Sequence, residues 1–169
     1  MDATQDAVLK VNRSQVLLRL ILGLAIFGLG CLYLERHIPI RQSALLLAPV
    51  MLLIAARPVY LLVTGRAVEC STEGLLDHTA GLGFLPWSEV RAARSRPYMF
   101  GQVVELELYD TDRVLKRFSA PKAWLWRYNL KKAFRGLPIM AFYVAGGATA
   151  VLEAIRGAAP SKVAVEHAH

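Results

Sequence analysis

The sequence predicts a membrane-embedded α-helical hairpin followed by a small α+β domain. Three observations predict this fold class. Residues 16–34 and 43–62 form two long apolar stretches, and only residues 35–42 separate them. After Gly65 the pattern changes to short segments in which apolar and polar residues alternate, as in half-buried β-strands. A short apolar segment, residues 148–156, follows a pair of glycines and is typical of a closing helix.

Each apolar stretch is long enough to cross a membrane. At 1.5 Å per residue, about 20 helical residues cover a hydrocarbon core of about 30 Å, and the short link around Pro39 allows only an antiparallel return. A signal peptide fits less well, because its apolar region is usually about 7–15 residues long. We therefore expect four parts: a cytoplasmic N-terminal segment (1–15), a transmembrane hairpin (16–65), a cytoplasmic domain (66–157) and a disordered tail (158–169).

Basic residues near the ends of the stretches indicate the orientation. Lys10 and Arg13 precede the first stretch, and Arg66 follows the second. The excess of Lys and Arg on cytoplasmic flanks therefore predicts that both termini are cytoplasmic. Arg57, which precedes Pro58, lies inside the second stretch. It is either an interfacial arginine at a bent helix exit or an intramembrane charge that pairs with a ligand or a partner.

Within the domain, the clearest strand is residues 102–109, where apolar residues alternate with Glu105 and Glu107. Residues 110–112 are a turn signal. Residues 123–135 carry an apolar stripe and a basic stripe at helical spacing, which predicts an amphipathic helix. Further strands are expected at residues 67–71, 90–95, 113–118 and 139–144.

No catalytic motif emerges from the sequence. Phosphate-binding loop, zinc-site and nucleophile-elbow patterns do not occur. Asp77 and His78 are adjacent, and we expect them in a solvated turn; Trp87 is expected to anchor the core. Cys31 and Cys70 lie in different parts of the chain, which predicts free thiols. We expect a non-enzymatic protein with no catalytic residue, no cofactor and no metal.

The chain has a net charge of +7, and many of its basic residues lie in one stretch. Residues 113–135 contain eight Lys or Arg and interleaved aromatic residues. One interpretation is a solvated helix face whose aromatic side fills the core. The other is attraction to an anionic lipid leaflet, worth about 1 kcal/mol per basic residue near the surface. Nucleic acid is not expected, because no binding motif is present. The predicted membrane-contact residues are Trp124, Trp126, Arg127, Lys131, Lys132 and Arg135.

The order of three motifs resembles a family of small uncharacterised bacterial inner-membrane proteins with two N-terminal transmembrane helices. The motifs are Glu-Gly-Leu-Leu-Asp at 73–77, Gly-Phe-Leu-Pro-Trp-Ser-Glu-Val at 83–90 and Gly-Leu-Pro-Ile-Met-Ala at 136–141. The resemblance implies a pleckstrin-homology-like (PH-like) domain, a bent antiparallel β-sheet capped by a C-terminal helix. It also implies a multi-pass location in the bacterial inner membrane. It brings no catalytic residues, and a fold alone does not define an activity.

The sequence thus predicts a non-enzymatic, membrane-anchored interaction module, acting as a scaffold or a regulatory subunit. Its expected partners are the lipid bilayer, including anionic headgroups, and a protein. An immunity-type membrane protein that protects against a toxin is an alternative. An alternative of another class is an oligomeric transporter component or a small membrane enzyme, in which Arg57 would face the centre of the oligomer.

Overall fold

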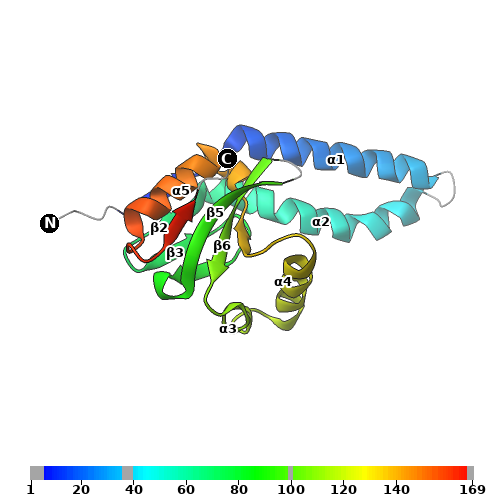
Figure 1. Ribbon diagram of the computed structural model, residues 1–169. Coiled ribbons are helices and arrows are strands. Elements are labelled where there is room, and N and C mark those ends of the chain that lie inside the picture. The colour runs from blue at the N-terminus through cyan, green and yellow to red at the C-terminus, as the bar shows by residue number, and fades with distance from the viewer. Residues whose placement is uncertain (1–5, 36–39, 99–100, 167–169) are drawn as a thin grey trace. The chain divides into compact units, whose positions relative to one another are not determined.

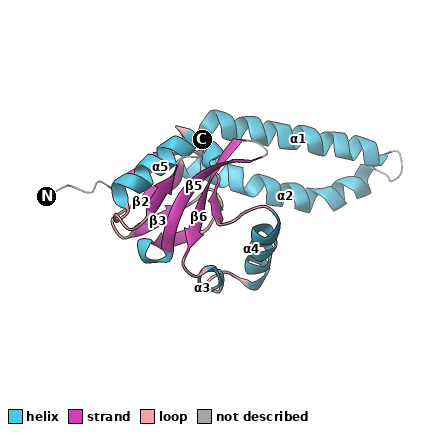
Figure 2. Ribbon diagram, in the orientation of Figure 1, coloured by secondary structure: helices cyan, strands magenta, loops and turns pink. Residues whose placement is uncertain are grey.

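The computed structural model describes residues 6–35, 40–98 and 101–166 (Figure 1). The chain forms two compact units. Residues 11–65 form a helical unit, and residues 1–10 together with 66–169 form a mixed α+β domain. Figure 2 shows that all described strands belong to the domain and that the helical unit contains only helices.

The helical unit consists of α1 (Arg13–Glu35) and α2 (Ile40–Thr64), which pack against each other. The Asn12 side chain caps α1 by accepting a hydrogen bond from the Gln15 amide. Among the described residues, one helix is long and apolar enough to cross a membrane. It covers Arg13–Tyr33, with a mean hydropathy of 2.2. Helix α2 contains Pro49 and Pro58. Both apolar stretches lie within helices, so the prediction that each is helical is confirmed.

The first sheet is antiparallel and has the order β1-β2-β3-β4. Its strands are β1 (Ala7–Lys10), β2 (Arg66–Cys70), β3 (Gly74–Asp77) and β4 (Gly83–Pro86). Strand β1 lies within residues 1–15, which the sequence indicated only as a segment before the hairpin. Because β1 pairs with β2, the whole helical unit is an insertion between two neighbouring strands.

The second sheet has the order β7-β6-β5-β8. It contains β5 (Val90–Tyr98), β6 (Gly101–Leu108), β7 (Leu137–Ile139) and β8 (Ala164–Glu166). Short 3₁₀ helices, η1 (Trp87–Glu89) and η2 (Ala141–Tyr143), precede β5 and follow β7. The prediction of disorder over 158–169 is therefore wrong for β8, which pairs in parallel with β5. Buried Val163 helps to hold this strand against the domain.

A helix replaces one predicted strand. Residues 113–118 were expected to form the return strand of a hairpin, but α3 (Thr111–Leu115) occupies this region. The Asp110 side chain accepts a hydrogen bond from the Arg113 amide at 2.9 Å and so caps the helix. Val114 and Leu115 are buried, so the apolar pair of the predicted strand fills the core from a helix.

The other predicted elements of the domain are present with shifted ends. The basic helix is α4 (Ala120–Lys132), and the closing helix is α5 (Gly147–Ala158). The strand expected at 139–144 ends at Ile139, and η2 follows it. Val151, Leu152 and Ile155 of α5 are fully buried, and α5 contacts strands of both sheets. The core therefore lies between the two sheets and α5.

Candidate functional site

The motif at residues 73–77 has a structural role at its last residue. Asp77 is 2% exposed. Its Oδ1 accepts hydrogen bonds from the Thr79 amide and hydroxyl at 2.8 and 2.6 Å. Its Oδ2 accepts from the amides of Ala80 and Leu82 at 3.0 and 3.1 Å. The expectation of a solvated turn is therefore wrong for Asp77, whose carboxylate organises the loop between β3 and β4.

The second motif contributes a core anchor. Trp87 is buried, and its Nε1 donates a hydrogen bond to the Ser71 carbonyl at 2.7 Å, which confirms the prediction. Gly74 permits a close strand approach, because a Cβ atom there would lie 2.4 Å from the Leu85 carbonyl oxygen. Both motifs thus help to hold the first sheet together.

His78 lies beside an ion pair on the same sheet. Its Nε2 is 3.1 Å from Glu69 Oε1, and Arg66 Nη1 is 3.3 Å from the same oxygen. Burial raises the pKa of Glu69, but the hydrogen bonds from His78 and Arg66 outweigh it and leave the pKa below the ordinary value. Burial raises the pKa of the neighbouring Cys70 thiol to about 12. Among the described residues, no group of His, Cys, Asp and Glu has the arrangement of a metal site.

Helix α4 presents an exposed surface with both aromatic and basic side chains. Trp124 is 67% exposed, and its ring stacks on Tyr128 with centroids 6.0 Å apart. Leu125 is also exposed. We define the α4 surface as Trp124, Leu125, Arg127, Tyr128, Lys131 and Lys132, all exposed side chains.

Two of the predicted membrane-contact residues lie elsewhere. Trp126 is only 7% exposed, so its ring belongs to the core beneath α4 and is not available at the surface. Arg135 follows the end of α4 and lines a separate hollow. Within the α4 surface, Arg127 makes a long ion pair with Asp112 at 3.6 Å.

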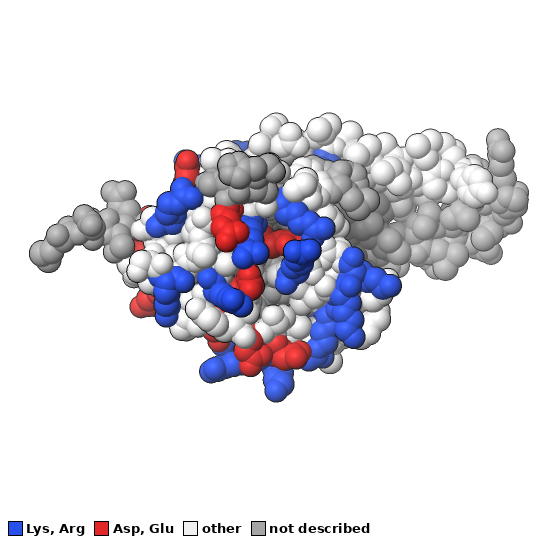
Figure 3. Space-filling model, in the orientation of Figure 1, with Lys and Arg blue, Asp and Glu red and all other residues white. Residues whose placement is uncertain are grey.

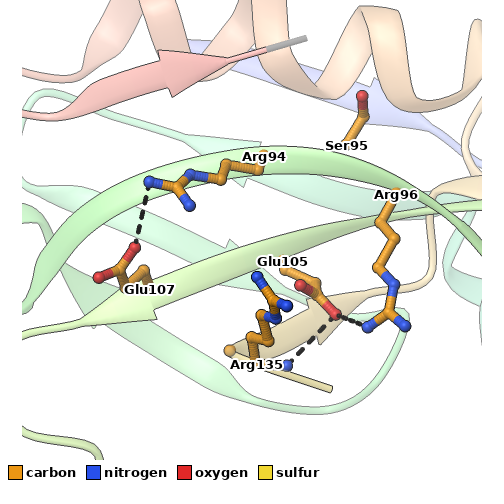
Figure 4. A pocket seen from close by; sticks show the side chains of 7 residues that line it. Arg94, Ser95, Arg96, Glu105, Glu107 and Arg135 are labelled. Atoms are coloured by element: carbon orange, nitrogen blue, oxygen red, sulfur yellow. Dashed lines mark hydrogen bonds and ion pairs between the residues drawn. The ribbon is translucent and has the colours of Figure 1, made fainter. Parts of the chain in front are cut away.

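The separate hollow lies over strands β5 and β6 and has a volume of about 540 Å³. Figure 3 shows basic and acidic side chains gathered over these strands and a second basic group over α4. We define the arginine hollow by its charged residues. They are Arg94, Arg96, Glu105, Glu107 and Arg135 (Figure 4).

Ion pairs fix the walls of the arginine hollow. Arg96 Nη1 lies 3.1 Å from Glu105 Oε1 and also donates to the Ala133 carbonyl at 2.8 Å. The Arg135 amide donates to the same Glu105 oxygen at 3.4 Å. Glu105 is 8% exposed, and its carboxylate therefore ties β5 to the segment before β7.

The second carboxylate of the hollow is shared between two arginines of β5. Arg91 Nη1 lies 3.2 Å from Glu107 Oε1, and Arg94 Nη2 lies 3.5 Å from Glu107 Oε2. Arg94 also reaches Glu166 of β8, with Nε 2.9 Å from Oε2. This site was not predicted from the sequence, because the strand expected at 90–95 ended before Arg96. In the structure β5 continues to Tyr98, which places Arg94 and Arg96 on one strand face.

Arg57 lies within α2 and is half-buried. Its guanidinium carbon is 5.2 Å from the centroid of the Tyr60 ring. A cation–π contact of this kind lowers the cost of a charge in apolar surroundings. The structure therefore gives Arg57 an aromatic neighbour on its own helix.

Comparison of the chain with protein-family models, with curated proteins and with solved structures finds no match. Any role for the α4 surface or the arginine hollow is therefore inferred from the geometry of these residues.

Proposed function

We propose that this protein is a non-enzymatic, membrane-anchored interaction module, a scaffold or regulatory subunit at the bacterial inner membrane. The surface of α1 carries this proposal. Large apolar side chains are exposed along the helix, with Arg19 as a charged residue near its N-terminal end, and an extended apolar surface of this kind is costly in water and stable in hydrocarbon. These exposed residues include Leu17, Leu18, Ile21, Leu22, Leu24, Ile26, Leu29 and Leu32.

Strand pairing supports two crossings rather than one. Val11 and Asn12 join β1 to α1, and Gly65 alone joins α2 to β2. The Val11 amide donates a hydrogen bond to the Gly65 carbonyl at 3.1 Å, so the two ends of the helical unit are adjacent. A chain that leaves a folded domain through α1 and returns to the next strand of the same sheet must cross an even number of times. If α1 spans the bilayer, α2 spans it in return.

The proposed domain fold is PH-like. Strands β1 to β4 and β5 to β7 form two sheets, and α5 follows them in sequence and contacts both. This order supports a bent sheet capped by a C-terminal helix. In this assignment the hairpin occupies the loop between β1 and β2, and β8 is an added edge strand.

Charge supports a cytoplasmic domain. Lys10, Arg13 and Arg66 flank the two ends of the helical unit that join the domain. Basic flanks stay on the cytoplasmic side of a membrane helix. The proposed topology therefore places both termini in the cytoplasm.

The α4 surface is the part of the domain that we propose contacts anionic headgroups. Stacked Trp124 and Tyr128 offer amphipathic rings that favour the membrane interface. Lys131 and Lys132 lie about one turn beyond Tyr128 on α4 and add positive charge. The hairpin holds the domain within a few residues of the bilayer, which raises the effective concentration of lipid and lowers the cost of contact.

Extraction and reporter fusions test the anchor. The full chain is expected to stay in the membrane fraction after alkaline carbonate treatment. A Leu22→Lys, Ile26→Lys variant should be largely released, whereas Glu153→Lys, at an exposed position of α5, should not. A C-terminal fusion should activate a cytoplasmic reporter and leave a periplasmic phosphatase silent. A monomer that is soluble without detergent would overturn the proposal.

Fluorescence tests the lipid contact of the α4 surface. The full chain in nanodiscs with brominated lipids should show quenched tryptophan emission when anionic lipid is included. Trp124 should account for the quenching, because Trp87 and Trp126 are buried. Added salt should reduce quenching, since the Debye length is only about 8 Å at 0.15 M.

A Lys131→Glu, Lys132→Glu variant should lose the quenching and keep its unfolding midpoint, because both side chains are exposed. Trp124→Phe is the control that removes the reporting ring. Equal quenching in neutral and anionic discs would contradict the electrostatic part of the proposal. A large loss of stability in the double variant would show that α4 has only a structural role.

A further inference from the structure

We infer that the arginine hollow is a docking site for the carboxylates of an acidic, extended segment of a partner protein. The inference rests on the proposed function as an interaction module and names the chemistry of its partner. Three features of the hollow lead to it: the direction of its arginines, their unused hydrogen-bond donors, and a carboxylate from the chain's own C-terminal strand.

Three arginines line one face of the second sheet. Arg94 and Arg96 are two residues apart on β5, so their side chains lie on the same face. Figure 4 shows Arg94 extending along β5 toward Glu107 and Arg96 crossing β6 toward Glu105, while Arg135 reaches toward β6 from the segment before β7. Three guanidinium groups therefore line the hollow against two carboxylates, Glu105 and Glu107. The charged lining is net positive by one unit, which favours an anionic ligand.

These guanidinium groups have donors to spare. Each carries five N–H donors in a planar fork that matches a carboxylate. Within the described chain, Arg96 uses only Nη1, and Arg94 uses Nε and Nη2. The Arg135 side chain is exposed and makes no ion pair or hydrogen bond in the same part of the structure. A ligand could therefore bind Arg135 without displacing an existing contact.

The chain itself provides an example of the proposed contact. Strand β8 lies beside β5 and brings the Glu166 carboxylate to Arg94 (Nε to Oε2, 2.9 Å). An extended segment thus already delivers a carboxylate to one wall of the hollow. Glu166 is more than half exposed, so a partner's carboxylate can compete with it for Arg94.

The hollow has the size and chemistry for more than one acidic side chain. Its volume of about 540 Å³ lies within the usual range of ligand sites, roughly 300–1,000 Å³. Glutamates at alternate positions of an extended segment point to the same side, which matches the spacing of Arg94 and Arg96. Arginine is also enriched among residues that dominate binding at protein interfaces.

Fluorescence anisotropy with the full chain in a neutral detergent tests the inference. The probe is a fluorescein-labelled Val-Glu-Val-Glu-Val-Glu peptide, and the control peptide has glutamine in place of each glutamate. The acidic peptide should bind about tenfold more tightly than the control. Arg135→Gln should weaken its binding about tenfold and leave the unfolding midpoint unchanged, because the side chain has no described partner. Glu166→Gln should strengthen binding, because it removes the competing carboxylate.

Arg156→Gln is the matched control, since Arg156 is another exposed arginine and lies on α5. It should leave the affinity unchanged. Equal affinities for the two peptides, or equal effects of the two arginine substitutions, would overturn the inference. The inference would also be overturned if the peptide did not bind in detergent and lipids with phosphate headgroups protected Arg135 from an arginine-modifying reagent. The hollow would then be a lipid-binding site. The assay contains no bilayer, so its failure is distinguishable from failure of the proposed membrane anchor.

Discussion

Asp77 and Thr79 form the junction between the first sheet and the segment after β7. The Thr79 hydroxyl donates to Asp77 Oδ1 at 2.6 Å and accepts a hydrogen bond from the Met140 amide at 2.9 Å. The same carboxylate also holds the amides of the loop that enters β4. One buried acid therefore connects residues that are more than 60 positions apart in sequence.

Asp77→Ala should strongly destabilise the domain. The substitution removes the acceptor of four hydrogen bonds and leaves buried donors without a partner, which costs about 3–5 kcal/mol in total. Asp110→Ala is the control, because this exposed helix cap should cost only about 1 kcal/mol. Urea unfolding in detergent, followed by circular dichroism, measures both. Equal losses for the two variants would contradict the structural role of Asp77.

Gly74 and Gly157 offer a matched pair of glycine substitutions. A Cβ at Gly74 would meet the Leu85 carbonyl oxygen at 2.4 Å, whereas a Cβ at Gly157 meets nothing within 4 Å. Gly74→Ala should therefore cost about 2–4 kcal/mol because the strands must separate. Gly157→Ala should be neutral or stabilise the domain by up to about 1 kcal/mol, because alanine favours a helix. Thermal unfolding of both variants decides the comparison.

Periodicity explains which elements were predictable. The alternation around Glu105 and Glu107 indicated β6, and the long apolar stretches indicated α1 and α2, because each pattern repeats over many residues. Residues 111–115 gave too short a pattern, and the decisive contact was the capping bond from Asp110. Strand β1 was missed for another reason: its partner β2 follows only after the inserted hairpin.

The candidate surfaces were only partly predictable. The exposed position of Lys131 and Lys132 follows from helical spacing, and the same spacing places Trp126 on the apolar stripe, where the structure buries it. The membrane-contact prediction nevertheless included both Trp124 and Trp126. The arginine hollow depends on pairing between β5, β6 and the segment before β7. Arg94, Glu105 and Arg135 are far apart in sequence, and each is ordinary alone, so only the tertiary structure brings them together.

Cys70 should resist thiol reagents in the folded domain. It is 1% exposed, and burial raises the pKa of its thiol to about 12. Thiolate is the reactive form, so almost none is present at pH 8. In a Cys31→Ser background, maleimide labelling should be slow in buffer and rapid in urea. Rapid labelling of the folded protein would contradict the buried position of the thiol.

Acid should weaken the domain partly through Glu69. Burial raises the pKa of this carboxyl, but the hydrogen bonds from His78 and Arg66 lower it by more than burial raises it. The pKa in the folded protein therefore lies below the ordinary value of 4.5. The ionised carboxylate therefore stabilises the fold above pH 4.5, and this contribution is lost as the pH falls below that value. Glu69→Gln should lower stability at pH 7 and flatten its dependence on pH below 4.5. Urea midpoints of both proteins between pH 3 and pH 7 measure the difference, and parallel pH profiles would contradict the assignment.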